Sequence, residues 1–228
     1  MMIEPARIFS LGDNAVTVEF GNEISEALND AAINLSRHFN AHPFPGFVEA
    51  VPAMASTTIF YRPHEVHFHD DLFPTAFASV EAKIKDAILN VSASEEAASQ
   101  LIEIPISFAS NHALDLEKIA GHSGITPDET IEIFLAKVYR VYMLGFLPGF
   151  AYMGEVDGRI AVPRLTTPRT AVPKGSVGIA GRQTGIYPSE SPGGWQIIGC
   201  TELELLTDNT NEPCIFRPGD HVRFFRPG

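Results

Sequence analysis

Hydrophobic and polar positions in the first part of the chain follow two different periods. Val16, Val18 and Phe20 alternate with polar residues, which is typical of a half-buried strand. Apolar residues recur at helical spacing from Ile24 to Phe39 and again from Phe73 to Ile88. The expected strands are Ala6–Leu11, Ala15–Phe20, Val48–Val51 and Thr57–Tyr61. The order β-β-α-β-β-α predicts an antiparallel sheet with both helices on one face.

Beyond residue 100, short apolar runs alternate with turns rich in Gly and Pro. Thr126, Pro127 and Glu129 form a capping-box pattern, which predicts a helix from there to about Ala136. The other expected elements are a strand at Leu101–Phe108, a short helix at Leu114–Ala120, and strands at Val138–Leu144, Ser176–Ala180, Thr184–Tyr187, Trp195–Thr201, Glu202–Leu206 and His221–Phe225. Many short strands joined by tight turns predict a barrel or a sandwich.

A change in composition separates these two parts. Residues 90–100 read NVSASEEAASQ, a small, polar and acidic stretch that either extends the preceding helix or links two domains. We predict an α+β protein with an N-terminal α/β sandwich domain at residues 1–92 and a β-barrel domain at residues 100–228.

Charge is distributed unevenly along the 228 residues, whose formal net charge is −12. Residues 1–140 carry 20 acidic and eight basic side chains, whereas residues 141–228 carry eight of each. This pattern lacks the basic footprint of a nucleic-acid-binding protein, so we expect no DNA or RNA partner.

The sequence also predicts a cytoplasmic protein with no membrane partner. The N-terminus has no basic region followed by an apolar core, as a signal peptide would. The longest uncharged apolar stretch, residues 141–154, is too short to span a bilayer. Two cysteines, Cys200 and Cys214, do not make a disulfide framework, and Cys200 is expected to be a buried small apolar residue.

The stretch from Gly145 to Gly199 is the candidate small-molecule site. It contains 11 of the 18 glycines and six prolines, which indicates many tight turns and close backbone approaches. Apolar residues are interspersed throughout, so the stretch is expected to fold rather than to act as a linker.

Three cations in this stretch, Arg164, Arg169 and Lys174, are spaced by five residues, and each is next to a proline. The prolines restrict the backbone, so the cations are expected to point in defined directions. Guanidinium and ammonium groups suit phosphate or carboxylate. The alternative is that all three are solvated loop residues.

The neighbouring turns offer polar and aromatic groups. Gln183 and Thr184, between two glycines, are expected to hydrogen-bond an amide or a carboxylate, the alternative being an ordinary β-turn. The loop residues that follow are candidates for walls and for backbone donors: Tyr187, Ser191, Gly193, Gly194 and Trp195. For Trp195, the only tryptophan, core packing is the alternative.

The histidine-rich run from His64 to Asp71 raises the question of a metal site. If this run were a strand, the side chains of His67 and His69 would lie on the same face, where they could bind a metal ion. We favour a solvent-exposed connecting segment and predict no metal site. Elsewhere the chain has no GxxxxGK[ST] motif, so if ATP is used, this chain does not hold it with a Walker loop.

Several long motifs together resemble one known family. They occur in order at residues 139–150 (YRVYMLGFLPGF), 167–169 (TPR), 172–173 (VP), 175–181 (GSVGIAG), 183–188 (QTGIYP) and 191–199 (SPGGWQIIG). They resemble the bacterial 5-oxoprolinase B-subunit family, also called allophanate hydrolase subunit 1 or KipI type. The resemblance is continuous over about residues 101–228 and looser before them. One departure is the loop at residues 108–116, which lacks the family's glycines but keeps Asp115-Leu116.

The resemblance implies a cyclophilin-like, carboxyltransferase-type β-barrel after a small N-terminal domain. It also implies a complex with the A and C subunits of 5-oxoprolinase, the latter of allophanate hydrolase subunit 2 type. Such complexes open 5-oxo-L-proline to L-glutamate with ATP. We expect ATP, with Mg, at a site shared with or on a partner subunit. Prolyl isomerase activity does not follow from the fold.

On this basis Lys174 and Gln183 are predicted to be catalytic. The residues predicted to bind substrate or phosphate are Arg164, Arg169, Thr184, Tyr187, Ser191, Gly193, Gly194 and Trp195. Two other functions remain open: an allophanate hydrolase or urea carboxyltransferase-type subunit, and a non-enzymatic inhibitor of a sensor histidine kinase.

Overall fold

The computed structural model describes residues 5, 7–70, 72–90, 99–209 and 213–227. The chain divides into two compact units, Met1–Ala98 and Ser99–Gly228. The predicted linker falls largely on residues 91–98, which lie outside the described residues. Each unit is described by itself.

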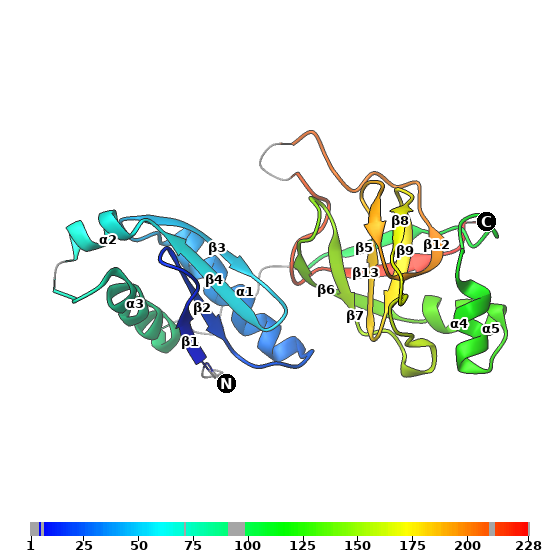
Figure 1. Ribbon diagram of the computed structural model, residues 1–228, viewed down its shortest axis with the longest axis horizontal. Coiled ribbons are helices and arrows are strands. Elements are labelled where there is room, and N and C mark those ends of the chain that lie inside the picture. Colours follow the sequence, from blue (N-terminus) through cyan, green and yellow to red (C-terminus); the bar gives the residue numbers. More distant parts are fainter. Residues whose placement is uncertain (1–4, 6, 71, 91–98, 210–212, 228) are drawn as a thin grey trace. The chain divides into compact units, whose positions relative to one another are not determined.

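Unit 1 is a four-stranded antiparallel sheet with two long helices on one face (Figure 1). Its strands are β1 (Arg7–Ser10), β2 (Ala15–Glu19), β3 (Phe47–Pro52) and β4 (Ser56–Tyr61), in the order β1-β2-β4-β3. Its long helices are α1 (Glu26–Ala41) and α3 (Ala76–Asn90). Val18 and Ile59 of the sheet share a buried core with Leu35 of α1 and Ile84 of α3. The predicted sheet with both helices on one face is confirmed.

A third helix in unit 1, α2 (Pro63–His69), corrects the sequence prediction for this segment. Pro63 is at the first helical position and Glu65 lies in the first turn, two features that favour a helix start. Residues two positions apart on a helix are separated by about 200°. His67 and His69 therefore do not share a face as they would on a strand.

Unit 2 is a curled seven-stranded sheet with the order β12-β9-β10-β7-β6-β13-β5. The strands are β5 (Leu101–Pro105), β6 (Val138–Leu144), β7 (Ala151–Gly154), β9 (Ser176–Ala180), β10 (Gln183–Ile186), β12 (Gln196–Cys200) and β13 (His221–Phe225). Neighbours are antiparallel except β13 and β5, which are parallel. Ser107 and Cys200 exchange two backbone hydrogen bonds of 2.8 and 3.0 Å, so the curled sheet brings its outer strands together. This agrees with the barrel-type fold expected for the second unit.

Two helices cover part of the barrel core: α4 (Leu116–Ser123) and α5 (Pro127–Leu135). The predicted capping box is confirmed at α5. The Glu129 N–H donates to the Thr126 hydroxyl at 3.2 Å, and the Thr126 N–H donates to the Glu129 carboxylate at 2.8 Å. The Thr126 N–H and the Thr126 hydroxyl both donate to the Glu129 carboxylate at 2.8 Å, and these two hydrogen bonds lower the pKa of Glu129.

The two faces of the curled sheet have separate cores. Val177 and Ile179 of β9 point inward into the main core, together with Ile186 of β10. Ala180 and Ile197 belong instead to a second cluster on the outer face. This outer cluster carries the candidate site.

Several elements differ from the sequence prediction. Strand β7, the ribbon strands β8 (Arg169–Val172) and β11 (Ser191–Gly193), and the 3-10 turn η1 (Gly158–Ile160) were not predicted. The strand predicted at Glu202–Leu206 is wrong, because the segment makes only an isolated bridge from Leu206 to Cys214. In the described part of the chain, no helix is long and apolar enough to cross a membrane.

Candidate functional site

An antiparallel ribbon of β8 and β11 packs on the outer face of the sheet in unit 2. Ser191 pairs with Val172, and Gly193 pairs with Arg169. Val172 is fully buried in the outer cluster with Trp195. The ribbon therefore places Arg169, Ser191 and Gly193 at the edge of this cluster.

Aromatic rings fill the cluster and meet edge to face. The ring centroid of Trp195 is 5.6 Å from that of Phe150 and 5.8 Å from that of Tyr152. Phe150 also lies 5.3 Å from Tyr187. Trp195 is only 5% exposed, so its surroundings are those of a core residue. A ligand would meet the edge of this cluster rather than an open indole face.

Two glycines on the strands beneath make room for these rings. A β-carbon at Gly178 would lie 2.9 Å from the Trp195 Cβ, and one at Gly185 would lie 2.9 Å from the Phe150 Cζ. Both distances are below those that real side chains adopt. Gly178 and Gly185 therefore let the rings rest directly on the backbone.

Arg164 and Arg169 come together around Tyr187 and Trp195. The exposed Arg164 guanidinium lies 5.9 Å from the centroid of the Trp195 ring. Arg169 approaches the Trp195 carbonyl oxygen at 3.5 Å. Burial raises the pKa of Tyr187, while a backbone hydrogen bond from Trp195 and the charges of Arg164 and Arg169 act in the opposite direction. The structure thus brings together four of the residues predicted to bind substrate.

The loop from Ser191 to Gly194 is closely packed. A β-carbon at Gly193 would overlap the phenol oxygen of Tyr187. The Gly194 carbonyl accepts a hydrogen bond from the Leu165 N–H at 2.7 Å. The largely buried Ser191 hydroxyl donates to the Pro192 carbonyl at 3.3 Å. These glycines and this serine hold the loop against Tyr187.

Gln183 and Thr184 do not act as a pair, because successive strand residues point to opposite faces. Thr184 is buried and donates its hydroxyl to the Gly178 carbonyl at 2.9 Å. Gln183 pairs with Ala180 of the outer cluster and is half-buried. Only Gln183 lies on the face that carries Arg164 and Trp195.

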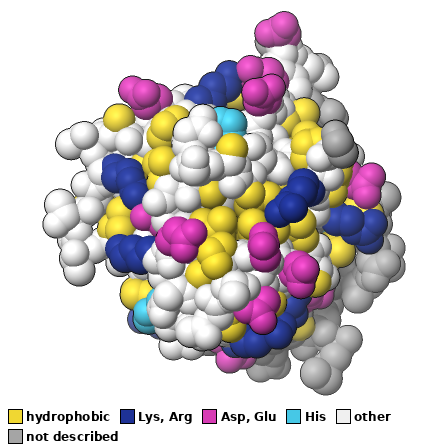
Figure 2. Space-filling model, turned by 90° about the vertical axis from the view of Figure 1, so that its right-hand side faces the viewer, with side chains coloured by type: hydrophobic (Ala, Val, Ile, Leu, Met, Phe, Trp, Pro, Cys, Tyr) yellow, Lys and Arg dark blue, Asp and Glu magenta, His cyan; other side chains and the backbone are white. Residues whose placement is uncertain are grey.

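Four of the five cations between residues 145 and 199 face carboxylates. The pairs are Arg159 with Asp157 at 3.0 Å, Arg169 with Asp115 at 2.7 Å, Lys174 with Glu204 at 2.7 Å, and Arg182 with Glu155. Within the described residues, Arg164 has no carboxylate partner. Figure 2 shows one face of the protein, on which acidic and basic side chains surround a central hydrophobic area.

Lys174 is held apart from the arginines by its own partner. Its ammonium is 2.7 Å from both carboxylate oxygens of Glu204, and both side chains are more than half exposed. Glu204 is 30 positions along the chain, so the spacing of the cations alone could not predict this pair.

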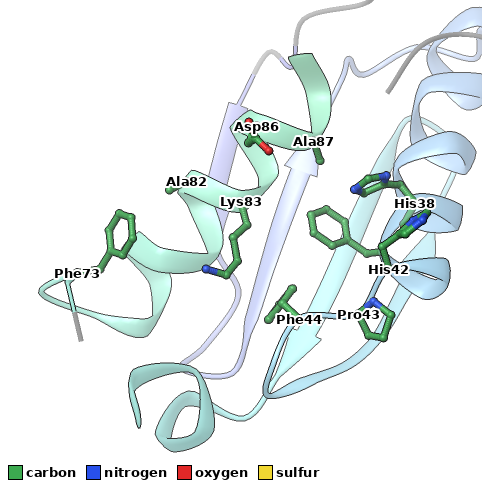
Figure 3. Close-up of a pocket in the computed structure, with 10 residues that line it drawn as sticks. His38, His42, Pro43, Phe44, Phe73, Ala82, Lys83, Asp86 and Ala87 are labelled. Atoms are coloured by element: carbon green, nitrogen blue, oxygen red, sulfur yellow. The ribbon is translucent and has the colours of Figure 1, made fainter. Parts of the chain in front are cut away.

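Unit 1 contains an open groove of about 430 Å³ between α1 and α3. His38 of α1 and His42, which directly follows α1, lie across from Lys83 and Asp86 of α3, with Phe44 nearby (Figure 3). Burial and the charge of His42 lower the pKa of His38, while Asp86 acts against them. The sequence did not predict this groove.

The histidine-rich run and the Cys200 thiol do not belong to the outer cluster. Among the described residues, no group of three or more His, Cys, Asp or Glu side chains could hold a metal ion. Asp70, from the histidine-rich run, accepts hydrogen bonds from Ser79 at 2.6 Å and Lys83 at 2.5 Å. Burial raises the pKa of the Cys200 thiol, which disfavours the nucleophilic thiolate.

Comparisons with known proteins place the chain in a family. The family model of the carboxyltransferase domain, subdomain C and D, matches residues 6–216. The 5-oxoprolinase B subunit of Bacillus subtilis (strain 168) is 41% identical over 221 residues, which is 96% of this chain and 92% of that protein. The protein of the same name from Escherichia coli O157:H7 is 35% identical over 97% of this chain and 96% of its own length.

A solved structure supports the same placement. The crystal structure of TTHA0988 matches 94% of this chain with a TM-score of 0.80 and 30% sequence identity. This chain spans 40% of the length of that larger one. On the family match and the two nearly full-length relatives, the chain belongs to the carboxyltransferase subdomain C and D family and, within it, to the 5-oxoprolinase B-subunit family.

Proposed function

We propose that this chain is one subunit of an ATP-dependent 5-oxoprolinase, which opens 5-oxo-L-proline to L-glutamate only in a complex. The observation that carries the proposal is the 41% sequence identity to a 5-oxoprolinase B subunit. This chain matches 92% of the length of that subunit. The other components are those that the resemblance implies, the A and C subunits, of which the latter is of allophanate hydrolase subunit 2 type.

The outer cluster supplies groups that suit this substrate. 5-Oxo-L-proline carries one carboxylate and one lactam amide, so it needs a cation and an amide-binding group. Arg164 has no carboxylate partner among the described residues and is free to pair with the substrate carboxylate. Gln183 lies on the same face and provides both a donor and an acceptor for the lactam.

ATP activates the lactam in this proposal. An amide is a poor electrophile. Transfer of the γ-phosphoryl group of ATP to the amide oxygen releases ADP and makes the carbonyl carbon open to attack by water, after which the ring C–N bond breaks and phosphate leaves. Phosphoryl transfer requires several cations around the phosphates. This chain offers Arg164 alone among its five cations between residues 145 and 199, which supports placing ATP and Mg mainly on a partner subunit.

Lys174 takes part in this chemistry only if it leaves Glu204. A partner subunit that binds Glu204 would release the ammonium, which is half-exposed and held by a surface ion pair. The catalytic role of Lys174 is therefore tied to the assembled complex.

Reconstitution tests the proposed function. The chain is combined with its A and C partners, and ATP hydrolysis is measured with 5-oxo-L-proline, allophanate and urea in separate reactions. We expect ATP hydrolysis and glutamate formation with 5-oxo-L-proline alone. Activity with urea or allophanate instead would favour the carboxyltransferase-type function. An inactive complex together with inhibition of a sensor histidine kinase would favour the regulator.

A further inference from the structure

Asp115 lies at a junction between three parts of unit 2. It directly precedes α4, and its side chain is 7% exposed. Its N–H donates to the Ile197 carbonyl at 2.8 Å, and the Ile197 N–H donates to its Oδ2 at 2.6 Å. One carboxylate oxygen is thus fixed by the backbone of β12, two residues from Trp195.

The other carboxylate oxygen binds Arg169 of the ribbon strand β8. The distance from Arg169 Nη2 to Asp115 Oδ1 is 2.7 Å, and the Arg169 side chain is 26% exposed. In a largely buried ion pair, the attraction offsets the loss of hydration only when the geometry is good. Removal of one partner leaves the other charge buried and uncompensated. Asp115 therefore determines where the guanidinium of Arg169 lies.

We propose that Asp115 is the positioning residue of this site. It holds Arg169 beside Tyr187 and Trp195 and neutralises its charge, so that Arg164 supplies the one net positive charge. The site then suits a small monocarboxylate better than a polyphosphate. This inference rests on the proposed function, and it adds to Arg164 and Gln183 a part for Arg169 in substrate binding.

Asp115→Asn removes the negative charge of the Asp115 side chain but keeps its shape. The amide oxygen still accepts the Ile197 N–H, but Arg169 loses its charged partner and its fixed position. In the reconstituted complex we expect KM for 5-oxo-L-proline to rise about tenfold while kcat changes less than about threefold, which is the pattern of lost substrate binding.

Asp220→Asn is the matched control. Asp220 is also a buried carboxylate of unit 2 that accepts backbone hydrogen bonds, from Arg217 at 2.8 Å and from Gln100 at 3.2 Å. Both variants are expected to lower the unfolding midpoint, but only Asp115→Asn should raise KM. An equal change in KM for both would show a merely structural role and would overturn the proposal.

The double variant Asp115→Asn with Arg169→Gln tests whether Asp115 acts through Arg169. If it does, KM of the double variant equals that of Arg169→Gln alone, whereas independent effects would multiply. Independent effects would contradict the proposal.

The same set of variants can be followed in the isolated chain by the fluorescence of Trp195, its only tryptophan. We expect Asp115→Asn and Arg169→Gln to change the emission to the same extent, with no further change in the double variant and none in Asp220→Asn. Additive changes would overturn the positioning role whether or not the complex is active. An inactive wild-type complex would refute the proposed function alone.

Discussion

Gly178→Ala tests how closely the aromatic cluster rests on the sheet. The added β-carbon would lie 2.9 Å from the Trp195 Cβ and 3.5 Å from the Ile197 Cδ1. The Trp195 Cβ is bonded to the backbone, so a change of rotamer cannot relieve the contact and β9 has to move away from β12. Overpacking of this kind costs about 1–3 kcal/mol of the free energy of unfolding.

The assay is urea unfolding followed by Trp195 fluorescence, which reports on unit 2 because the single tryptophan lies there. Gly158→Ala is the control, because a β-carbon at that position meets no atom within 4 Å. The control should stay within about 0.5 kcal/mol of wild type. A Gly178→Ala variant with wild-type stability and emission would refute the reasoning that the rings need bare backbone beneath them.

Three further outcomes are expected. Arg164→Ala should raise KM for 5-oxo-L-proline in the reconstituted complex by about tenfold to a hundredfold, because a charged hydrogen bond is worth about 1.5–3 kcal/mol; an unchanged KM would exclude Arg164 from substrate binding. Thr126→Ala should cost α5 about 0.5–2 kcal/mol in urea unfolding. The pKa of Glu129 is lowered in the folded protein, so its stabilising contribution is present above the unfolded pKa of about 4.3 and is lost as pH falls through the folded pKa. Thr126→Ala should therefore weaken the dependence of stability on pH in this range. An unchanged dependence of stability on pH would contradict this reasoning. The hydrogen bond from Lys83 lowers the pKa of Asp70, so Asp70 also contributes stability that is lost as pH falls. Asp70→Asn should remove this loss of stability in acid, which unfolding midpoints measured from about pH 5 down to about pH 2 would show.

Local patterns explain which parts of the fold could be predicted. Strands β6, β9 and β13 have the predicted bounds, because their apolar residues and flanking turns are local features. The capping box at Thr126 is local as well. Helix α2 was missed because it is short and buries Val66 while Phe68 remains exposed, so its hydrophobic period is weak.

The candidate site depended on pairings that sequence spacing does not show. Arg169 and Lys174 look alike as cations next to proline, yet one meets Asp115, 54 positions away, and the other meets Glu204, 30 positions away. These partners are set by the folded sheet, so the sequence identified the segment but could not distinguish the ion-paired cations from Arg164.

The position of β13 in the sheet has a consequence for how unit 2 is made. Strand β5 opens this unit, but it pairs along its length with β13, which follows all the other strands of the sheet in the sequence and also pairs with β6. Contacts between residues so far apart in the chain form slowly. Unit 1, whose strands pair within a much shorter stretch of chain, can fold while the ribosome is still at work. Unit 2 has to wait until β13 is available, and until then β5 and β6 lack the strand that separates them.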